Sequence, residues 1–176
     1  TMTVAIVIFA LGFMKGAMNG VFLNTAVIIS GHEKVVTRAY KEESQMLPND
    51  LALLDANQII KQLNEEYPDY FWTPRITFGG LLDIPNKNGE TKNQGPVIAV
   101  GIELLNKDSR QAEIWELNRN LTKGRLPKNS NEALISKKLA EKLAISVGDV
   151  ATYIGTTMHN AFTTYNFKIV GTFDLR

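Results

Sequence analysis

The N-terminal stretch of this chain, residues 1–31, is almost free of charge, and it constrains the fold more than any other feature. Lys15 is its only ionisable side chain, whereas the residues from His32 onward carry the mixed charge of a soluble surface. Residues 1–14 are apolar on every side of a helix. A bilayer core requires about 20 apolar residues, so these fourteen residues do not make a complete transmembrane helix.

Three interpretations of residues 1–14 are open. A signal-peptide core has a suitable length, but no basic segment precedes it and the chain does not begin with Met. A buried helix of a globular protein also fits. We favour the outer part of a transmembrane helix whose start is missing, with Lys15 reaching the membrane surface and residues 16–29 continuing the helix. Packing in a membrane or between helices then explains the side chains of Met2, Phe9, Phe13, Met14, Met18 and Phe22.

The composition excludes several functional classes. Charged residues are 21% of the 176 residues and the formal net charge is +1, whereas nucleic-acid-binding domains usually have a marked basic excess. The chain has no cysteine, which excludes disulfides, thiolate zinc sites and cysteine nucleophiles. This length accommodates one domain, or one domain with a smaller lobe.

The first part of the soluble region predicts a strand followed by an amphipathic helix. Residues 32–40 are rich in β-forming residues and predict the first strand. Asp55 is a candidate N-cap of a helix, with Gln58 in the capping-box position, and Pro68 marks its end. The apolar face of this helix has helical spacing and consists of Ile59, Ile60, Leu63 and Tyr67.

The middle of the chain predicts a hairpin. Residues 70–84 resemble a strand, and Pro74 places its centre at an edge or a bend because proline cannot donate to the ladder. Residues 85–96 predict the hairpin loop. Residues 97–105 begin with a continuous apolar run, which predicts a strand buried on both faces. The remaining predicted elements are a short helix at 111–121 and strands at 150–154 and 163–173, with a loop at 155–160.

Residues 131–149 predict a strand, a two-turn helix and a tight turn. A short apolar run precedes Ser136, whose hydroxyl can cap a helix N-terminus. Leu139 and Leu143 are four residues apart and therefore share one face of that helix. Gly148-Asp149 is a turn signal.

Catalytic and metal-binding patterns are absent from the sequence. His32 and His159 are isolated, whereas a metal site requires ligands at recognisable spacing. No serine lies in a Gly-x-Ser-x-Gly motif, and Gly79-Gly80 and Gly101 do not form a phosphate-binding loop. The paired carboxylates Glu42-Glu43 and Glu65-Glu66 are typical of a solvated surface. We therefore expect no enzymatic activity and no metal or cofactor bound by this chain.

Several short motifs occur in the order that is typical of one family. They are Gly31-His32-Glu33-Lys34-Val35, Pro74-Arg75-Ile76, Ile98-Ala99-Val100-Gly101-Ile102, Thr122-Lys123-Gly124-Arg125-Leu126-Pro127, residues 131–149, and residues 167–173. In this order they resemble the extracytoplasmic, MacB-like periplasmic core domain of ABC-exporter permeases of the MacB, LolC/LolE and FtsX-like group. The residues that carry the resemblance are Gly31, His32, Pro74, Arg75, Gly101, Gly124, Arg125, Pro127, Glu132, Leu139, Leu143, Gly148, Asp149 and Gly171.

The resemblance implies an α+β fold with two lobes after a partly transmembrane helix. Residues 1–30 are then part of the first transmembrane helix and its extension. Residues 31–102 form a porter-like strand–helix–strand lobe, and residues 103–176 form a small mixed lobe rich in strands. In the family the domain continues beyond the closing strand, so we expect this chain to lack the C-terminal part of the domain. The motif residues have structural roles in this interpretation.

The resemblance also implies a function without catalysis in this chain. ATP binds to a separate ABC ATP-binding subunit, two permease copies or paralogues form a dimer, and helices transmit movement to the outer domains. The domain then releases or exports a lipoprotein, lipid, peptide or drug, with a periplasmic adaptor or lipoprotein carrier as a further partner. Gly31-His32 favours the lipoprotein-releasing branch slightly. The implied location is the cytoplasmic (inner) membrane, with the soluble domain outside the cytoplasm.

Two other functional classes remain open. The first is a binding or adaptor module with a single membrane anchor and no ATPase partner. The second is an anchored hydrolase with a site assembled from His159, Asp174 and Glu132. These hypotheses differ in whether an ATP-binding subunit accompanies the chain and in whether His159 is required.

Overall fold

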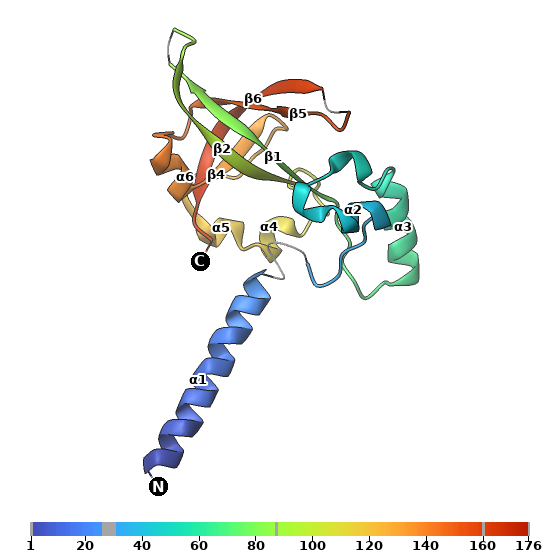
Figure 1. The fold of residues 1–176 in the computed structure, drawn as a ribbon, viewed down its shortest axis with the longest axis vertical. Coiled ribbons are helices and arrows are strands. Elements are labelled where there is room, and N and C mark those ends of the chain that lie inside the picture. The colour runs from blue at the N-terminus through green and yellow to red at the C-terminus, as the bar shows by residue number, and fades with distance from the viewer. Residues whose placement is uncertain (1, 26–30, 87, 160, 176) are drawn as a thin grey trace. The chain divides into compact units, whose positions relative to one another are not determined.

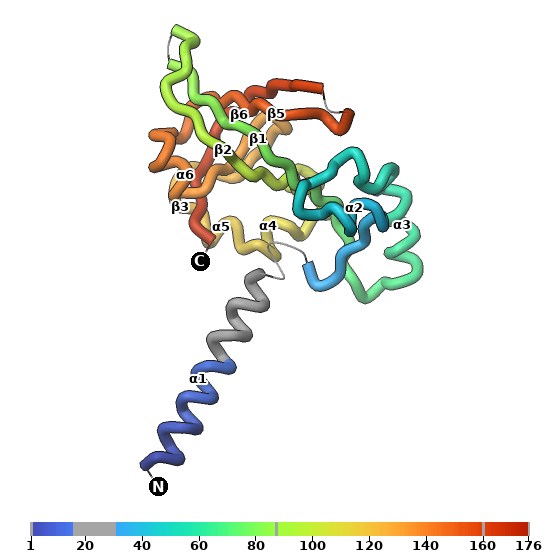
Figure 2. Tube along the Cα trace, in the orientation of Figure 1, coloured from blue at the N-terminus to red at the C-terminus, as the bar shows by residue number. Residues whose placement is uncertain are grey.

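The chain has two parts, an apolar helix and an α+β unit that is built on one sheet (Figure 1). The computed structural model describes the backbone of residues 2–25, 31–86, 88–159 and 161–175, and the side chains of these residues except 16–25. The two compact units are Thr1–Val35 and Val36–Arg176. Figure 2 follows the path of the chain through each unit.

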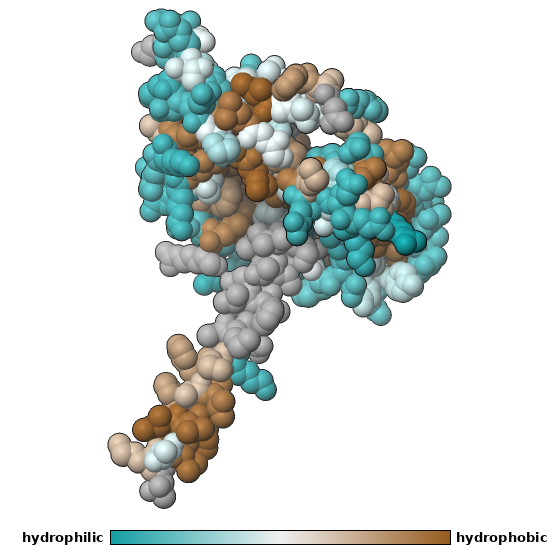
Figure 3. All heavy atoms as spheres, viewed as in Figure 1, coloured by the Kyte–Doolittle hydropathy of each residue, from teal (hydrophilic) through white to brown (hydrophobic). Residues whose placement is uncertain are grey.

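The first unit contains helix α1, Met2–Thr25. Its described side chains are almost all hydrophobic (Figure 3), and large ones are exposed, with 75% of Phe9 and 71% of Phe13 accessible. In the part of the chain that the structure describes, no helix has both the length and the hydropathy needed to cross a membrane. The predicted break at Ser30 and the side chains of Met18 and Phe22 lie outside the described residues.

The predicted strand at residues 32–40 is wrong. The chain is irregular up to Thr37, and helix α2, Arg38–Glu42, follows. The Thr37 hydroxyl accepts a hydrogen bond from the Tyr40 N–H at 3.0 Å and donates one to the Leu51 carbonyl at 2.6 Å. This N-cap gives the backbone a local partner, which outweighs the β propensity of the neighbouring residues. The 3-10 turns η2, Ser44–Met46, and η3, Asn49–Leu51, complete the segment.

Helix α3, Ala56–Glu66, confirms the predicted amphipathic helix. Asp55 occupies the N-cap position, but its side chain makes no cap hydrogen bond. Its φ is 53°, a left-handed conformation that aspartate tolerates better than most residues. The helix ends at Tyr67, whose N–H donates to the Leu63 carbonyl at 2.8 Å.

The second unit is built on one curled, mostly antiparallel sheet. Strand order is β2-β1-β5-β6-β3, and β4 pairs with β6 in parallel. This sheet with its short helices confirms the predicted α+β class. The strands are β1 Arg75–Pro85, β2 Thr91–Ile102, β3 Leu121–Gly124, β4 Glu132–Ser136, β5 Val150–Thr156 and β6 Phe162–Phe173.

The β1–β2 hairpin is longer than predicted because its loop is shorter. β2 begins at Thr91, although residues 91–95 are mostly polar. The Asn86 carboxamide oxygen accepts hydrogen bonds from the N–H groups of Asn88 and Glu90, at 2.8 and 3.0 Å. This side chain closes the turn within a few residues and lets the ladder continue to its tip.

β2 is an edge strand, so the prediction of a strand buried on both faces is wrong. Ile98 is 75% exposed and Val100 is 42% exposed. Only one face of this apolar run therefore packs against the core. In the register, Val97 lies opposite Gly80 and packs against the core, whereas Ile98 lies opposite Gly79.

The predicted helix at 111–121 is divided into α4, Gln111–Ile114, and α5, Leu117–Asn120. Glu116 separates them with a φ of 47°. The prediction for residues 131–149 is confirmed: β4 leads into α6, Lys137–Lys142, and Ser136 caps it by accepting from the Leu139 N–H at 3.3 Å. The central core comprises Leu82, Ile84, Ile135, Ala140, Leu143, Ile145, Ala151, Tyr153 and Ile169.

Candidate functional site

Motif residues that are distant in sequence meet at residues 168–172 of β6. The Arg125 N–H donates to the Val170 carbonyl at 2.9 Å, and the Gly148 N–H donates to the Ile169 carbonyl at 2.7 Å. The Lys168 N–H donates to the Asn131 carbonyl at 2.9 Å. Two loops, one containing Arg125 and Asn131 and the other containing Gly148, are therefore bonded to one short length of strand.

The loop from Gly124 to Glu132, which we call the 124–132 turn, is held by one ion pair. Arg125 Nη1 lies 2.7 Å from Glu132 Oε2, and Arg125 Nη2 lies 2.6 Å from Glu132 Oε1. Such a two-point pairing fixes the direction as well as the distance between the groups. The Lys128 N–H and the Asn129 carboxamide also donate to the Glu132 carboxylate, at 2.8 and 3.3 Å.

The electrostatics of this turn favour the charged forms of both side chains. The hydrogen bond from Arg125, followed by that from the Lys128 N–H, holds the pKa of the Glu132 carboxyl well below its usual range. The same bond raises the pKa of Arg125. The Glu132 side chain is 6% exposed. An ionised carboxylate with these partners is suited to fixing a loop and is a poor proton donor.

Two glycines allow the 124–132 turn to lie against β6. Gly124 has a φ of 81°, and a Cβ there would overlap the Val170 carbonyl oxygen. A Cβ on Gly171 would lie 2.7 Å from the Arg125 carbonyl oxygen. These positions need glycine because two backbones approach each other, and Gly124 also has a left-handed conformation.

The remaining motif residues of this half pack against the core or close turns. Leu143 is buried in the core, Leu139 packs against it, and Pro127 is half-buried. Asp149 accepts from the Ser146 N–H at 2.8 Å and closes the turn that contains Gly148, whose φ is 104°.

The motif residues of the first half form separate groups. Gly31 and His32 belong to the first unit. At the start of β1, after Pro74, the Arg75 guanidinium lies 5.1 Å from the centre of the Trp115 ring, and burial lowers the pKa of Arg75. A Cβ on Gly101 would lie 2.7 Å from Ile76 Cγ2, so this position also depends on close packing.

The hydrolase hypothesis named three side chains that the structure does not bring together. His159 lies in the loop before β6, whereas Asp174 follows the end of β6. A strand rises by about 3.3 Å per residue, so the twelve residues of β6 separate the two. Glu132 is bound to Arg125. Within the described ranges, no three His, Cys, Asp or Glu side chains are grouped as a metal site would require.

Sequence reasoning missed a buried side chain in α4 and an aromatic group at the end of α3. Gln111 is 1% exposed, and neither polar atom of its carboxamide has a hydrogen-bond partner in the structure. Its position four residues before Trp115 was a signal that both share a buried helix face. The sequence also gave no reason to group Tyr67, Tyr70 and Trp72, because a turn at Pro68 brings their rings together.

No family model matches this chain, and no curated protein matches it.

Proposed function

We propose that this chain is a non-catalytic extracytoplasmic domain of an ABC transporter permease subunit. It couples ATP hydrolysis on a separate subunit to the release or export of a lipoprotein, lipid, peptide or drug, and lipoprotein release is slightly favoured. The observation that carries the proposal is the set of bonds that joins the 124–132 turn, residues 148–149 and β4 to one segment of β6. A domain that transmits movement must move as a rigid body. These hydrogen bonds support such rigidity because they fix the two loops and β4 to β6.

The exposed apolar surface of α1 supports a membrane anchor. Val4, Ile8 and Phe9 are each more than half exposed. Apolar surface of this extent is unfavourable in water and is stabilised by lipid or by other helices. The proposal assigns residues 1–30 to the first transmembrane helix and its extension.

The proposal divides the soluble part into a porter-like lobe at 31–102 and a small mixed lobe at 103–176. Both lobes contribute to the same sheet, since β1 pairs with β5 from Leu81 opposite Ile154 to Asp83 opposite Thr152. A force applied to one lobe is then transmitted to the other through backbone hydrogen bonds. The partners are an ABC ATP-binding subunit, a second permease copy or paralogue, and an adaptor or lipoprotein carrier.

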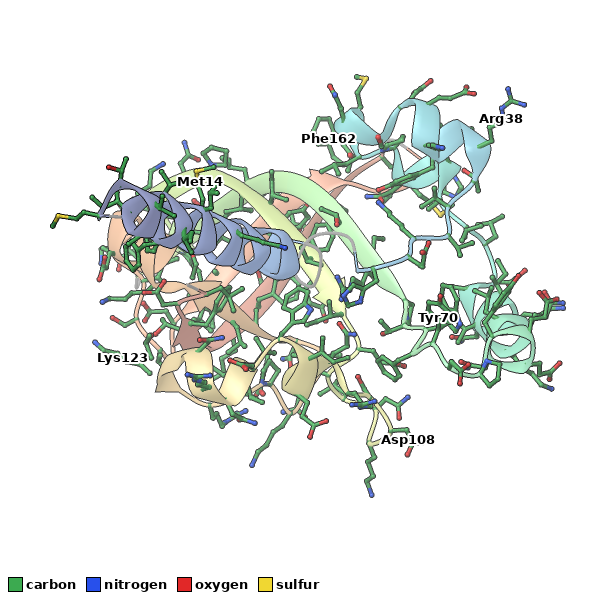
Figure 4. The ribbon with its side chains drawn as sticks, turned by 90° about the horizontal axis from the view of Figure 1, so that it is seen from below. Met14, Arg38, Tyr70, Asp108, Lys123 and Phe162 are labelled. Carbon is green, nitrogen blue, oxygen red and sulfur yellow. The ribbon has the colours of Figure 1, made fainter. Side chains whose placement is uncertain are left out.

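Cysteine labelling in intact spheroplasts tests the location. The chain has no cysteine, so each single-cysteine variant has a clean background. Lys123→Cys is an exposed position on the second unit (Figure 4), and Phe9→Cys is the matched position in α1. We expect a membrane-impermeant maleimide to label Lys123→Cys without lysis and to leave Phe9→Cys unlabelled. Labelling of Lys123→Cys only after lysis would contradict an extracytoplasmic domain.

A further inference from the structure

Three aromatic rings lie together on the surface where α3 ends. The Tyr70 N–H donates to the Tyr67 carbonyl at 3.2 Å, and this turn folds the two tyrosines toward each other. Their ring centres are 6.4 Å apart in an edge-to-face arrangement, and Tyr70 stacks on Trp72 at 5.6 Å. Tyr67 and Trp72 are also 6.4 Å apart. Figure 4 shows Tyr70 beside α3. We call Tyr67, Tyr70 and Trp72 the aromatic trio.

The two tyrosines of the aromatic trio are accessible, and negative charges flank the trio in the chain. Tyr67 is 49% exposed and Tyr70 is 50% exposed. Three exposed carboxylates flank them in the chain, namely Glu65, Glu66 and Asp69. The faces of aromatic rings carry negative potential, so rings and carboxylates attract the same kind of ligand. That ligand is a cation.

Two other rings of the second unit, those of Trp115 and Phe71, already have a cation near their faces. The Arg75 guanidinium lies 5.1 Å from the Trp115 ring centre, and the Arg110 guanidinium lies 5.9 Å from that of Phe71. Among the described residues, no guanidinium or ammonium group lies over a ring of the aromatic trio, and none of the three carboxylates is in an ion pair. The aromatic trio and the three carboxylates are therefore available to a positively charged partner.

We propose that the aromatic trio and its carboxylates bind a basic segment of a partner protein. An arginine or lysine side chain lies on the tyrosine rings, and further positive charges pair with Glu65, Glu66 and Asp69. The sign of the charge argues against an anionic lipid surface or a nucleic acid as the occupant. This surface does not depend on the proposed permease function.

The fluorescence of Trp72 tests the proposal. Trp115→Phe leaves Trp72 as the sole tryptophan and keeps an aromatic ring beside Arg75. The full chain in a nonionic detergent is titrated with a peptide of four Gly-Arg repeats, and with four Gly-Glu repeats as the control peptide. We expect saturable quenching or a spectral shift with the arginine peptide alone, and weaker binding as salt is added.

Variants of the surface identify the binding groups. We expect Tyr70→Ala to weaken binding of the arginine peptide by about fivefold. Neutralising all three carboxylates by Glu65→Gln, Glu66→Gln and Asp69→Asn keeps the rings and should weaken binding at least as much. Tyr165→Ala removes another half-exposed tyrosine, 47% exposed on β6, and should bind as the parent does.

Several outcomes would overturn the proposal. Equal binding of both peptides, or unchanged affinity in both the Tyr70→Ala and the neutralised variants, contradicts a cation site at the aromatic trio. Binding of phosphatidylcholine vesicles without binding of the arginine peptide would identify a lipid headgroup as the occupant instead. Circular dichroism melts of each variant show whether a loss of binding reflects unfolding.

Discussion

Glu132 is the residue whose charge state matters most for the 124–132 turn. Its carboxylate has four hydrogen-bond contacts, from Arg125, Lys128 and Asn129. Its pKa in the fold is lowered, whereas an unfolded chain has a glutamate pKa of about 4.3. Because the folded pKa is depressed, the stabilisation is fully present above that value and is lost as the pH falls through the lower, folded pKa.

This gives a prediction for the Glu132→Gln variant. We expect its thermal midpoint to lie several degrees below the wild-type value at pH 7, and the difference to shrink as the pH falls below about 4. Calorimetric melts between pH 7 and pH 3 measure this. Glu116→Gln is the matched control, because Glu116 pairs with Arg119 on the surface, where the side chains are 57% and 80% exposed, and such pairs contribute little. A difference that is constant with pH would contradict the account.

Two glycines have the same backbone conformation but different surroundings. Comparing them separates the cost of a left-handed φ from the cost of steric overlap. Gly124 and Gly89 have φ values of 81° and 83°, but a Cβ on Gly89 would meet nothing within 4 Å. We expect Gly89→Ala to cost about 1 to 2 kcal/mol of unfolding free energy, from conformation alone. Gly124→Ala should cost more than about 3 kcal/mol, because the Cβ also displaces Val170. Urea unfolding measures both, and equal losses would show that β6 does not crowd Gly124.

At the scale of the element, α4 contains a buried polar group with no partner in the described structure. Gln111 is 1% exposed and both carboxamide atoms are unpaired. Methionine has a similar size and no such polar atoms, so Gln111→Met should raise the unfolding free energy by about 1 to 2 kcal/mol. Gln58→Met on exposed α3 is the control and should change it by less than about 0.5 kcal/mol. A clear loss in Gln111→Met would show that the carboxamide is hydrogen-bonded in solution.

The short helix α6 depends on its cap. The Ser136 hydroxyl accepts from the Leu139 N–H, and Leu143 at the other end lies in the core. We expect Ser136→Ala to lower the unfolding free energy by about 1 kcal/mol. Ser136→Asp retains a cap acceptor and should lower the unfolding free energy much less. Chemical denaturation of both variants measures the difference, and equal losses would assign the effect to something other than the cap.

Elements with a strong local signal could be predicted from the sequence, and others could not. α3 has helical apolar spacing and α6 has a cap and an i, i+4 leucine pair, so both were found. The strand prediction for residues 32–40 is wrong because the Thr37 hydroxyl caps the N-terminus of a helix among residues that favour strands. An apolar run such as residues 97–102 fits a central strand as well as an edge strand. Its composition therefore does not indicate that β2 lies at the edge of the sheet.

At the scale of the whole molecule, the α+β class was predictable but the strand pairing was not. Alternation and turn residues located most strands, whereas the contacts of β6 with β3, β4 and β5 join residues up to 52 positions apart, as between Leu121 and Phe173. The grouping of Arg125, Glu132 and Gly148 at β6 follows from that pairing. The motif order alone could not supply it, because spacing in sequence does not determine which strands become neighbours.

Purification from native membranes tests the central claim most directly. The full chain, tagged and expressed in its source organism, is extracted in a mild detergent, and the eluate is analysed by mass spectrometry and assayed for ATP hydrolysis. An unrelated tagged membrane protein from the same cells is the control. We predict that an ABC ATP-binding subunit co-purifies in a comparable amount and that the eluate hydrolyses ATP. Recovery of the chain without any ATP-binding subunit would contradict the permease proposal and favour an adaptor with a single anchor.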